Sequence, residues 1–175
     1  CNFENDKPVL MMMGGSLGSV KINTTFRKII DELLLEFNVI HICGLGNLDE
    51  QLNNVVGYKQ FEYVSDELPH LFAITSLMIS RAGANAIAEI VALKIPSMLI
   101  PLSLEASRGD QILNANSMAK QGFCMVLEEN KMTEETLKRG VRTLYGQKDM
   151  YIKNMTGSES KSGIELVLKE IRKYK

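Results

Sequence analysis

The sequence predicts an α/β domain built on a Rossmann-like, doubly wound parallel sheet. Short apolar segments alternate with helix-like segments along the whole chain. Because these segments are apolar on both of their faces, they are typical of strands covered by helices on both sides of a sheet. With 175 residues, 45% of them apolar and 23% charged, the chain has the size and composition of one globular domain with a real core. We expect six strand–helix units.

The strands are predicted where a short apolar run ends at glycine, proline or a polar turn. The first such run is PVLMMMG, and the second is NVIHICG. The third, YKQFEYV, alternates between polar and apolar residues, which also favours a strand. The six predicted strands span 8–14, 38–44, 58–64, 76–83, 96–101 and 123–129.

The helices are predicted from apolar side chains that recur every three or four residues. Between the first two strands this spacing runs from Phe26 to Phe37. Asn47 and Glu50 have the spacing of a capping box, which predicts a short helix that reaches about Val56. Further helices are predicted over 66–75, 84–94, 108–122, 133–145 and 161–173, with a linker-like stretch at 156–163.

Charge and composition argue against several classes of protein. The net charge is −1 and the pI is near 6.2, so no basic excess favours nucleic acid as a partner. No apolar stretch reaches the roughly 18 to 20 residues that span a bilayer, and the first residues do not resemble a signal peptide. Cys1, Cys43 and Cys124 have no metal-binding spacing and are expected to be free, mostly buried thiols of a cytoplasmic protein. Because residue 1 is not methionine, we treat the chain as a possible fragment of a longer protein.

In doubly wound sheets ligands bind beyond the carboxyl ends of the strands, so the loops that follow strands are the candidate sites. The first is GGSLGS, over 14–19. Glycines allow a tight turn and a close approach to the backbone, and a helix that begins there offers free N–H groups to a phosphate. The motif fits neither the dinucleotide fingerprint nor a Walker A loop. It could equally be a plain strand-to-helix turn with a serine N-cap.

The second candidate loop is SRAGANAIAE, over 80–89. Gly83 ends a strand, and the small residues that follow it leave the first amides of a helix accessible to a diphosphate. Glu89 lies further along the same helix, and its carboxylate can accept hydrogen bonds from the two vicinal hydroxyls of a ribose. The alternative is a glutamate that only complements the helix dipole.

The third candidate loop is PLSLEASRGDQILNAN, over 101–116. Asp110, Gln111 and Asn114 gather at the start of a helix, and their carboxylate and carboxamide groups suit sugar hydroxyls. The alternative is helix capping by Asp110 with solvated neighbours. The three loops together describe the donor half of a nucleotide-sugar transferase far more specifically than any one of them alone.

The motifs GGSLGS, SRAGANAIAEIVALKIPSMLIPLS and SRGDQILNA strongly resemble the C-terminal domain of the bacterial MurG family, from about Val9 to Ile171. Enzymes of this family transfer N-acetylglucosamine (GlcNAc) from UDP-GlcNAc to undecaprenyl-pyrophosphoryl-MurNAc-pentapeptide, which makes lipid II for peptidoglycan. They have the GT-B fold, in which two Rossmann-like domains enclose the active site. The resemblance implies that residues 1–175 form the single, C-terminal UDP-sugar-binding domain and that the N-terminal acceptor domain is absent from this chain. It also implies a peripheral location on the cytoplasmic face of the cell membrane for the full-length protein.

The resemblance also implies a role for particular residues. The donor's uracil would be held by a backbone group, its ribose by a carboxylate, and its diphosphate by helix amides. The sugar hydroxyls would be held by a carboxamide at the start of the third candidate helix. The residues implied are Ser16 for the phosphate or sugar, Val64 for uracil, Ala84, Asn85, Ala86, Ile87 and Ala88 for the diphosphate, Glu89 for ribose, and Gln111 for GlcNAc with Asp110 and Asn114 beside it.

The family inverts the anomeric centre by direct displacement, so the charge that develops on UDP must be stabilised. Helix amides can do this without a metal, and no paired-aspartate motif is present, so we expect neither a metal nor another cofactor. The general base would belong to the missing domain, so no catalytic residue is assigned here. His41 and His70 are expected to be structural. We expect the 175-residue chain alone to bind UDP-GlcNAc weakly and to turn over nothing.

Three other functions fit parts of the pattern. The first is a stand-alone UDP-sugar-binding subunit that pairs with a membrane subunit, as in Alg13/Alg14-like enzymes. The length of the natural protein separates the two, because two such domains need about 350 residues. A dinucleotide oxidoreductase is disfavoured by the missing fingerprint and by the lack of an acidic residue about 20 residues beyond the first loop. A UDP-GlcNAc 2-epimerase would need catalytic acids across the cleft, outside this chain.

Overall fold

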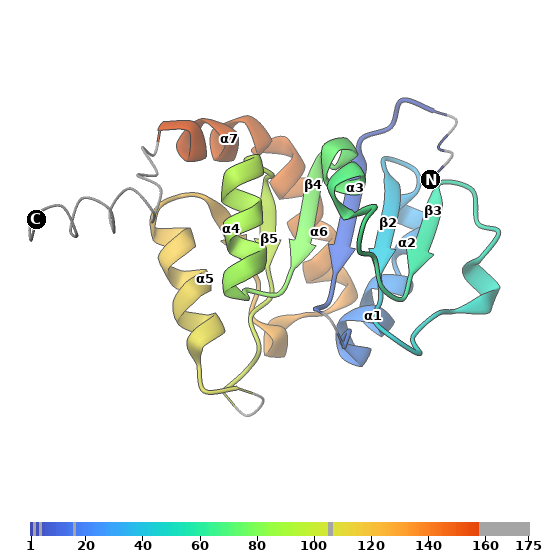
Figure 1. The fold of residues 1–175 in the computed structure, drawn as a ribbon, viewed down its shortest axis with the longest axis horizontal. Coiled ribbons are helices and arrows are strands. Elements are labelled where there is room, and N and C mark those ends of the chain that lie inside the picture. Colours follow the sequence, from blue (N-terminus) through green and yellow to red (C-terminus); the bar gives the residue numbers. More distant parts are fainter. Residues whose placement is uncertain (2, 4, 16, 105–106, 158–175) are drawn as a thin grey trace, which may run out of the picture.

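The computed structural model describes residues 1, 3, 5–15, 17–104 and 107–157, and these residues form the predicted α/β fold (Figure 1). Six parallel strands make one sheet in the order β3-β2-β1-β4-β5-β6. Because all six strands are parallel, their carboxyl ends lie along the same side of the sheet, which we call its carboxyl edge. The strands are β1 (Val9–Met13), β2 (Asn38–Ile42), β3 (Tyr58–Phe61), β4 (Leu77–Ser80), β5 (Ser97–Leu99) and β6 (Cys124–Val126).

Helices cover both faces of the sheet, which confirms the doubly wound arrangement. In Figure 1, α3, α4 and α5 lie in front of the sheet, whereas α1, α2 and α6 lie behind it. An ion pair between Lys138 of α6 and Glu32 of α2, at 2.9 Å, joins two helices of the rear layer. The helices are α1 (Val20–Arg27), α2 (Ile30–Leu33), α3 (Leu68–Ile74), α4 (Ala84–Leu93), α5 (Asp110–Lys120), α6 (Glu134–Gly146) and α7 (Lys148–Gly157), with 3₁₀ turns η1 (Glu50–Leu52) and η2 (Glu129–Lys131).

The helical segment between β1 and β2 differs from its prediction in start and continuity. It begins at Val20, directly after the GGSLGS turn, and not at Phe26. It also divides in two near Ile29, where the N–H of Ile29 bonds to the carbonyl of Phe26, three residues back, at 3.1 Å. The apolar spacing alone could not show this break, because side chains on both sides of it remain buried against the sheet.

Two further predictions of local structure were wrong. The capping box at Asn47 and Glu50 does not form, because the turn begins later, where Asp49 Oδ1 accepts from the N–H of Gln51 at 3.1 Å, and Asn47 Nδ2 donates to the carbonyl of Leu45 at 3.0 Å. Only the 3₁₀ turn η1 follows, and its N-cap is Asp49. The linker predicted at 156–163 begins inside α7, which extends to Gly157. The rest of that linker and the helix predicted over 161–173 lie outside the described residues.

The GGSLGS turn packs directly on the loop that follows β2, and Gly18 makes this contact possible. Gly18 has φ +72°, and a Cβ atom placed on it would lie 2.0 Å from the carbonyl oxygen of Cys43. That oxygen also accepts a hydrogen bond from Asn23 Nδ2 at 2.8 Å, so it cannot easily move away. The close approach fixes the end of β1 against the end of β2.

We therefore expect Gly18→Ala to destabilise the domain by about 3 kcal/mol or more, from backbone strain and the clash together. Gly46→Ala is the matched control, because Gly46 has the same φ of +72° but no atom within 4 Å of its added Cβ. That control is expected to lose only about 1 kcal/mol, from the left-handed backbone alone. Urea unfolding of both variants measures the difference, and equal losses would show that the contact with Cys43 does not matter.

His41 is a structural residue of the core, as expected. Its ring is fully buried on β2 and packs edge-on against Phe26 at a centroid distance of 5.3 Å. Asn23 Oδ1 accepts from His41 Nε2 at 3.0 Å, because the amide nitrogen of Asn23 is already used on a carbonyl. His41 Nδ1 is then left to accept from the Tyr58 hydroxyl at 2.8 Å. Both ring nitrogens are therefore satisfied in the neutral form. His70, in contrast, is exposed on α3.

Burial, together with the charge of Arg27, lowers the pKa of His41 to about 3 from its ordinary value of 6.5. Between these two values the unfolded chain binds a proton that the folded chain does not, so stability is complete above pH 6.5 and is lost as the pH falls toward 3. We expect His41 to contribute a slope of up to about 1.4 kcal/mol per pH unit in that window. Urea unfolding between pH 4 and 7 measures it. His41→Gln should flatten the slope, and the control His70→Gln removes an exposed histidine instead; an unchanged slope in His41→Gln would contradict this account.

Two expectations from composition can be compared with the structure. Cys43 and Cys124 are buried free thiols, whereas Cys1 is free but exposed. Burial raises the pKa of Cys124 to about 12. Within the described part of the chain, no helix is both long and apolar enough to cross a membrane.

Candidate functional site

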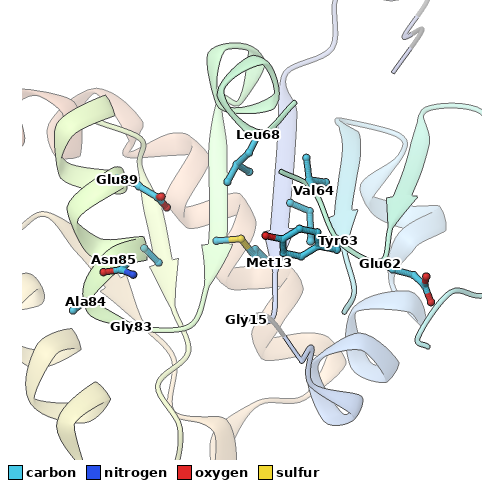
Figure 2. Close-up of a pocket in the computed structure, with 12 residues that line it drawn as sticks. Met13, Gly15, Glu62, Tyr63, Val64, Leu68, Gly83, Ala84, Asn85 and Glu89 are labelled. Atoms are coloured by element: carbon cyan, nitrogen blue, oxygen red, sulfur yellow. The ribbon is translucent and has the colours of Figure 1, made fainter. Parts of the chain in front are cut away.

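A cavity of about 540 Å³ opens at the carboxyl edge of the sheet, between the ends of β1 and β3 and the start of α4 (Figure 2). Its volume lies in the range of pockets that hold small organic ligands. The strand order reverses between β1 and β4, and doubly wound sheets bind ligands beyond the carboxyl ends of the strands at such a reversal. The walls of the cavity are Met13, Gly15, Ile42, Glu62, Tyr63, Val64, Leu68, Gly83, Ala84, Asn85, Ala86 and Glu89.

One wall of this cavity is the start of α4, and no side chain among the described residues caps it. Gly83 is the N-cap residue, has no side chain to offer, and no acidic residue stands in the first turn. Ala84, Asn85 and Ala86 line the cavity with their small side chains. The first amides of a helix have no partner inside the helix and carry a partial positive charge. This end of α4 is therefore suited to bind an anion.

The predicted set of free amides on α4 is too long by at least one residue. The N–H of Ile87 donates to the carbonyl of Gly83 at 3.0 Å, so it is not available to a ligand. The Ile87 side chain packs against the core, and Ala88 is exposed and lines neither cavity of this site. The amides that are available to a ligand are therefore confined to the first turn of α4, because intrahelical bonding begins with Ile87.

Glu89 lies on α4 above this first turn, and its carboxylate faces the cavity (Figure 2). Its side chain is half-buried, and no hydrogen bond or ion pair with another described residue holds it. A carboxylate offers acceptor sites on both oxygens and donates nothing when ionised. Glu89 is therefore free to accept hydrogen bonds from hydroxyl groups of a ligand.

The opposite wall is formed by the segment that follows β3. Val64 is buried at 8% exposure and lines the cavity, whereas the neighbouring Tyr63 is 69% exposed. Figure 2 shows the Tyr63 ring at the mouth of the cavity, with its hydroxyl toward Met13, and Glu62 pointing away. Glu62 Oε1 accepts from the N–H of Gly46 at 2.6 Å. The sequence analysis named Val64 as a site residue but not Tyr63, which also lines the cavity. The aromatic residue directly before Val64 was the available signal.

A second cavity, of about 370 Å³, lies beside the first and shares part of its lining. The shared residues are Met13, Gly15, Gly83 and Ala86. Gln111 of α5 forms its far side, and Gln111 Oε1 accepts from the N–H of Leu102 at 3.1 Å. The carboxamide NH₂ group is thus left to face a ligand. The two cavities are neighbours, with Ala86 in the lining of both.

Asp110 and Asn114 do not line either cavity. Asp110 is exposed as the first residue of α5, and Gly109 rather than Asp110 is the N-cap, with φ +88°. Asn114 Nδ2 donates to the carbonyl of Ala82 at 3.1 Å. Asn114 therefore holds α5 against the loop before α4, which is a structural role that spacing along a helix could not predict.

The GGSLGS turn carries its own N-cap. Ser19 precedes α1, and its hydroxyl accepts from the N–H of Ile22 at 3.4 Å. The start of α1 is therefore partly occupied by the protein, in contrast to the uncapped start of α4. Ser16 lies outside the described residues. Arg81, which sequence reasoning passed over within the SRAGAN motif, lines the second cavity beneath this turn.

The described residues contain no group of three or more His, Cys, Asp or Glu side chains placed to hold a metal ion. This observation does not test whether the reaction needs a metal, so that expectation stays a prediction.

Residues 9–171 match the model of the family described as "Glycosyltransferase family 28 C-terminal domain". The chain belongs to this family. The match covers every strand of the sheet and both cavities. It agrees with the resemblance seen in the three sequence motifs.

Curated relatives and a solved structure agree with the family. The chain is 52% identical over 172 residues to the UDP-N-acetylglucosamine–N-acetylmuramyl-(pentapeptide) pyrophosphoryl-undecaprenol N-acetylglucosamine transferase of Lachnospira eligens, with 98% of this chain and 49% of the relative covered. It is 52% identical over 176 residues to the enzyme of the same name from Clostridium novyi, with 100% and 49% covered. The MurG structure from Acinetobacter baumannii superposes with a TM-score of 0.77 at 22% identity, covering 94% of this chain and 50% of that one. The fold is that of the C-terminal half of a GT-B glycosyltransferase, and the chain spans about half the length of these relatives.

Proposed function

We propose that this chain is the donor-binding domain of an inverting transferase that moves GlcNAc from UDP-GlcNAc to a lipid-linked MurNAc-pentapeptide. The acceptor in this proposal is the undecaprenyl-pyrophosphoryl compound named in the relatives, and the product is lipid II for peptidoglycan. Residues 1–175 would form a single UDP-sugar-binding unit. The acceptor, the general base and the contact with the cytoplasmic face of the membrane would belong to an N-terminal domain that this chain does not contain.

One observation carries the proposal: a helix start without a cap and a carboxylate without a partner, as judged among the described residues, lie in the same cavity. The first turn of α4 is suited to a diphosphate. Glu89, about one turn further along the same helix, is suited to the two hydroxyls of a ribose. The buried Val64 segment on the opposite wall would hold the uracil ring through its backbone. The sugar would extend into the second cavity toward the Gln111 carboxamide.

The same arrangement supports the chemistry of the transfer. When the acceptor hydroxyl attacks the anomeric carbon, the bond to UDP breaks and negative charge grows on the diphosphate. In this proposal the amides at the start of α4 would face the diphosphate from fixed positions, so they would stabilise the leaving group without reorganisation. Neither a metal nor another cofactor is needed in this scheme.

Calorimetric titration of the 175-residue chain with UDP-GlcNAc, UDP-GalNAc and UDP-glucose tests the proposal. We expect weak binding of all three, tightest for UDP-GlcNAc, and no transfer by the chain alone because the base and acceptor site are absent. Titration with a nicotinamide dinucleotide is the control. Lack of UDP-GlcNAc binding, or robust transfer by this chain alone, would contradict the proposal.

A further inference from the structure

Arg81 is a buried charged residue at the junction of the loops that surround the second cavity. It directly follows β4, and its side chain is only 8% exposed. Its partner Glu129 lies in the 3₁₀ turn η2 beyond β6 and is 14% exposed. A buried ion pair contributes little net stability on average, so its presence beside a binding site calls for another explanation.

The Arg81 guanidinium uses four hydrogen bonds to join four segments. Nη1 donates to Glu129 Oε2 at 3.0 Å and to the carbonyl of Ile100 at 3.2 Å. Nη2 donates to Glu129 Oε1 at 3.1 Å and to the hydroxyl of Ser19 at 2.9 Å. The two bonds to Glu129 form the parallel fork that only arginine can make with a carboxylate, and this fork fixes the plane of the guanidinium.

The two remaining bonds reach opposite sides of the second cavity. Ser19 ends the GGSLGS turn and caps α1, so its position sets the course of that turn. Ile100 directly follows β5 and lies two residues before Leu102, whose N–H donates to Gln111 Oε1 at 3.1 Å. Arg81 thus connects the glycine-rich turn on one side with the Gln111 carboxamide on the other.

Although Arg81 lines the second cavity, the four hydrogen bonds of its guanidinium all go to other parts of the protein. Glu129 accepts from both terminal nitrogens, and the other two bonds go to a hydroxyl and a carbonyl. No such link runs from Arg81 to Glu89 or Val64, the residues assigned to the uridine half of the donor.

We propose that Arg81, held by Glu129, is a positioning residue for the diphosphate-sugar half of the donor. It keeps the GGSLGS turn and the start of α5 at the separation that the phosphates and the sugar require, and it does not itself contact the uridine half. This inference rests on the proposed function and adds a specific set of residues to it.

The test compares two ligands on the same variants of the 175-residue chain. Arg81→Lys keeps the charge but loses the fork, and Glu129→Gln keeps the shape but leaves one of the two fork bonds without an acceptor. NMR titration with UDP-GlcNAc and with uridine gives both affinities for each variant. We expect both variants to bind UDP-GlcNAc at least tenfold more weakly and to bind uridine within twofold of the unmodified chain.

The control is Glu128→Gln, which removes the neighbouring exposed carboxylate that pairs with Lys131 at 2.7 Å. It should change neither affinity. Equal losses for uridine and UDP-GlcNAc, or no loss for either, would overturn the inference. Tighter UDP-GlcNAc binding by Glu129→Gln would also overturn it, because a freed guanidinium would then be a direct phosphate ligand.

If Arg81→Lys or Glu129→Gln fails to fold, a milder variant provides the same test. Ser19→Ala deletes one of the four acceptors and leaves the ion pair in place, at a capping cost of about 1 kcal/mol. It should show the same selective loss for UDP-GlcNAc, and a uniform or absent loss would count against the inference. If the unmodified chain binds neither ligand, the proposed function fails, and that result is distinct from a failure of the positioning role.

Discussion

Glu89→Ala is expected to weaken the binding of UDP to the 175-residue chain by about 100-fold. The carboxylate faces the cavity without a partner among the described residues, so its acceptor sites are available to the ribose. Two hydrogen bonds from the ribose hydroxyls to an ionised carboxylate contribute about 1.5 to 3 kcal/mol each, and 1.4 kcal/mol corresponds to a tenfold change in affinity. Isothermal titration calorimetry measures the loss directly.

A ligand lacking both ribose hydroxyls makes the Glu89 test specific. The unmodified chain should prefer UDP over 2′,3′-dideoxy-UDP by a wide margin, and Glu89→Ala should bind the two equally. Glu135→Ala, which removes an exposed carboxylate on α6, is the control and should keep the preference. A preference that survives in Glu89→Ala would show that another group recognises the ribose.

Ala86→Asp is expected to lose UDP-GlcNAc binding by about 100-fold or more while the domain stays folded. Ala86 lies in the first turn of α4 and lines both cavities, so an added carboxylate would stand where the diphosphate is expected. The same carboxylate is favourable for the helix, because a negative charge near its start contributes about 0.3 to 1 kcal/mol. Affinity and thermal stability should therefore change in opposite directions.

Ala86→Asn separates charge from size in this test, because asparagine has nearly the same shape as aspartate without the charge. We expect it to bind UDP-GlcNAc more tightly than Ala86→Asp and more weakly than the unmodified chain. Ala92→Asp, on the exposed last part of α4, should leave the affinity unchanged. Calorimetry and thermal unfolding of the three variants are sufficient, and equal affinities for Ala86→Asp and the unmodified chain would place the diphosphate elsewhere.

The sheet could be predicted from the sequence because its strands are short apolar runs separated by helices. Leu10, Met11 and Met12, for example, are fully buried, as expected for a central parallel strand. The exceptions are local. Asn47 uses its side chain on a loop carbonyl in place of a helix cap, and the break near Ile29 leaves the apolar spacing intact. These local hydrogen bonds and helix breaks depend on contacts with residues distant in the sequence, so they could not be predicted from the sequence alone.

Only some of the residues around the two cavities could be predicted from the sequence. Ala84 and Glu89, which line the cavity, could be singled out because they lie on the helix that follows a predicted strand, whereas Val64 was singled out only by the resemblance to the MurG family. Asn114 has a carboxamide near the start of a helix, as expected of a residue that binds a sugar. Its Nδ2 nevertheless donates to the carbonyl of Ala82. The bonds of Arg81 to Glu129 span 48 residues, and no spacing rule connects positions that far apart.

A crystal structure of this chain with UDP-GlcNAc tests the account most directly. We expect the diphosphate within hydrogen-bond distance of the first amides of α4, at Ala84 to Ala86, and both ribose hydroxyls on the Glu89 carboxylate. The GlcNAc ring should lie in the second cavity, on the side of Gln111. A nucleotide bound away from the start of α4, or with its ribose turned from Glu89, would contradict the account.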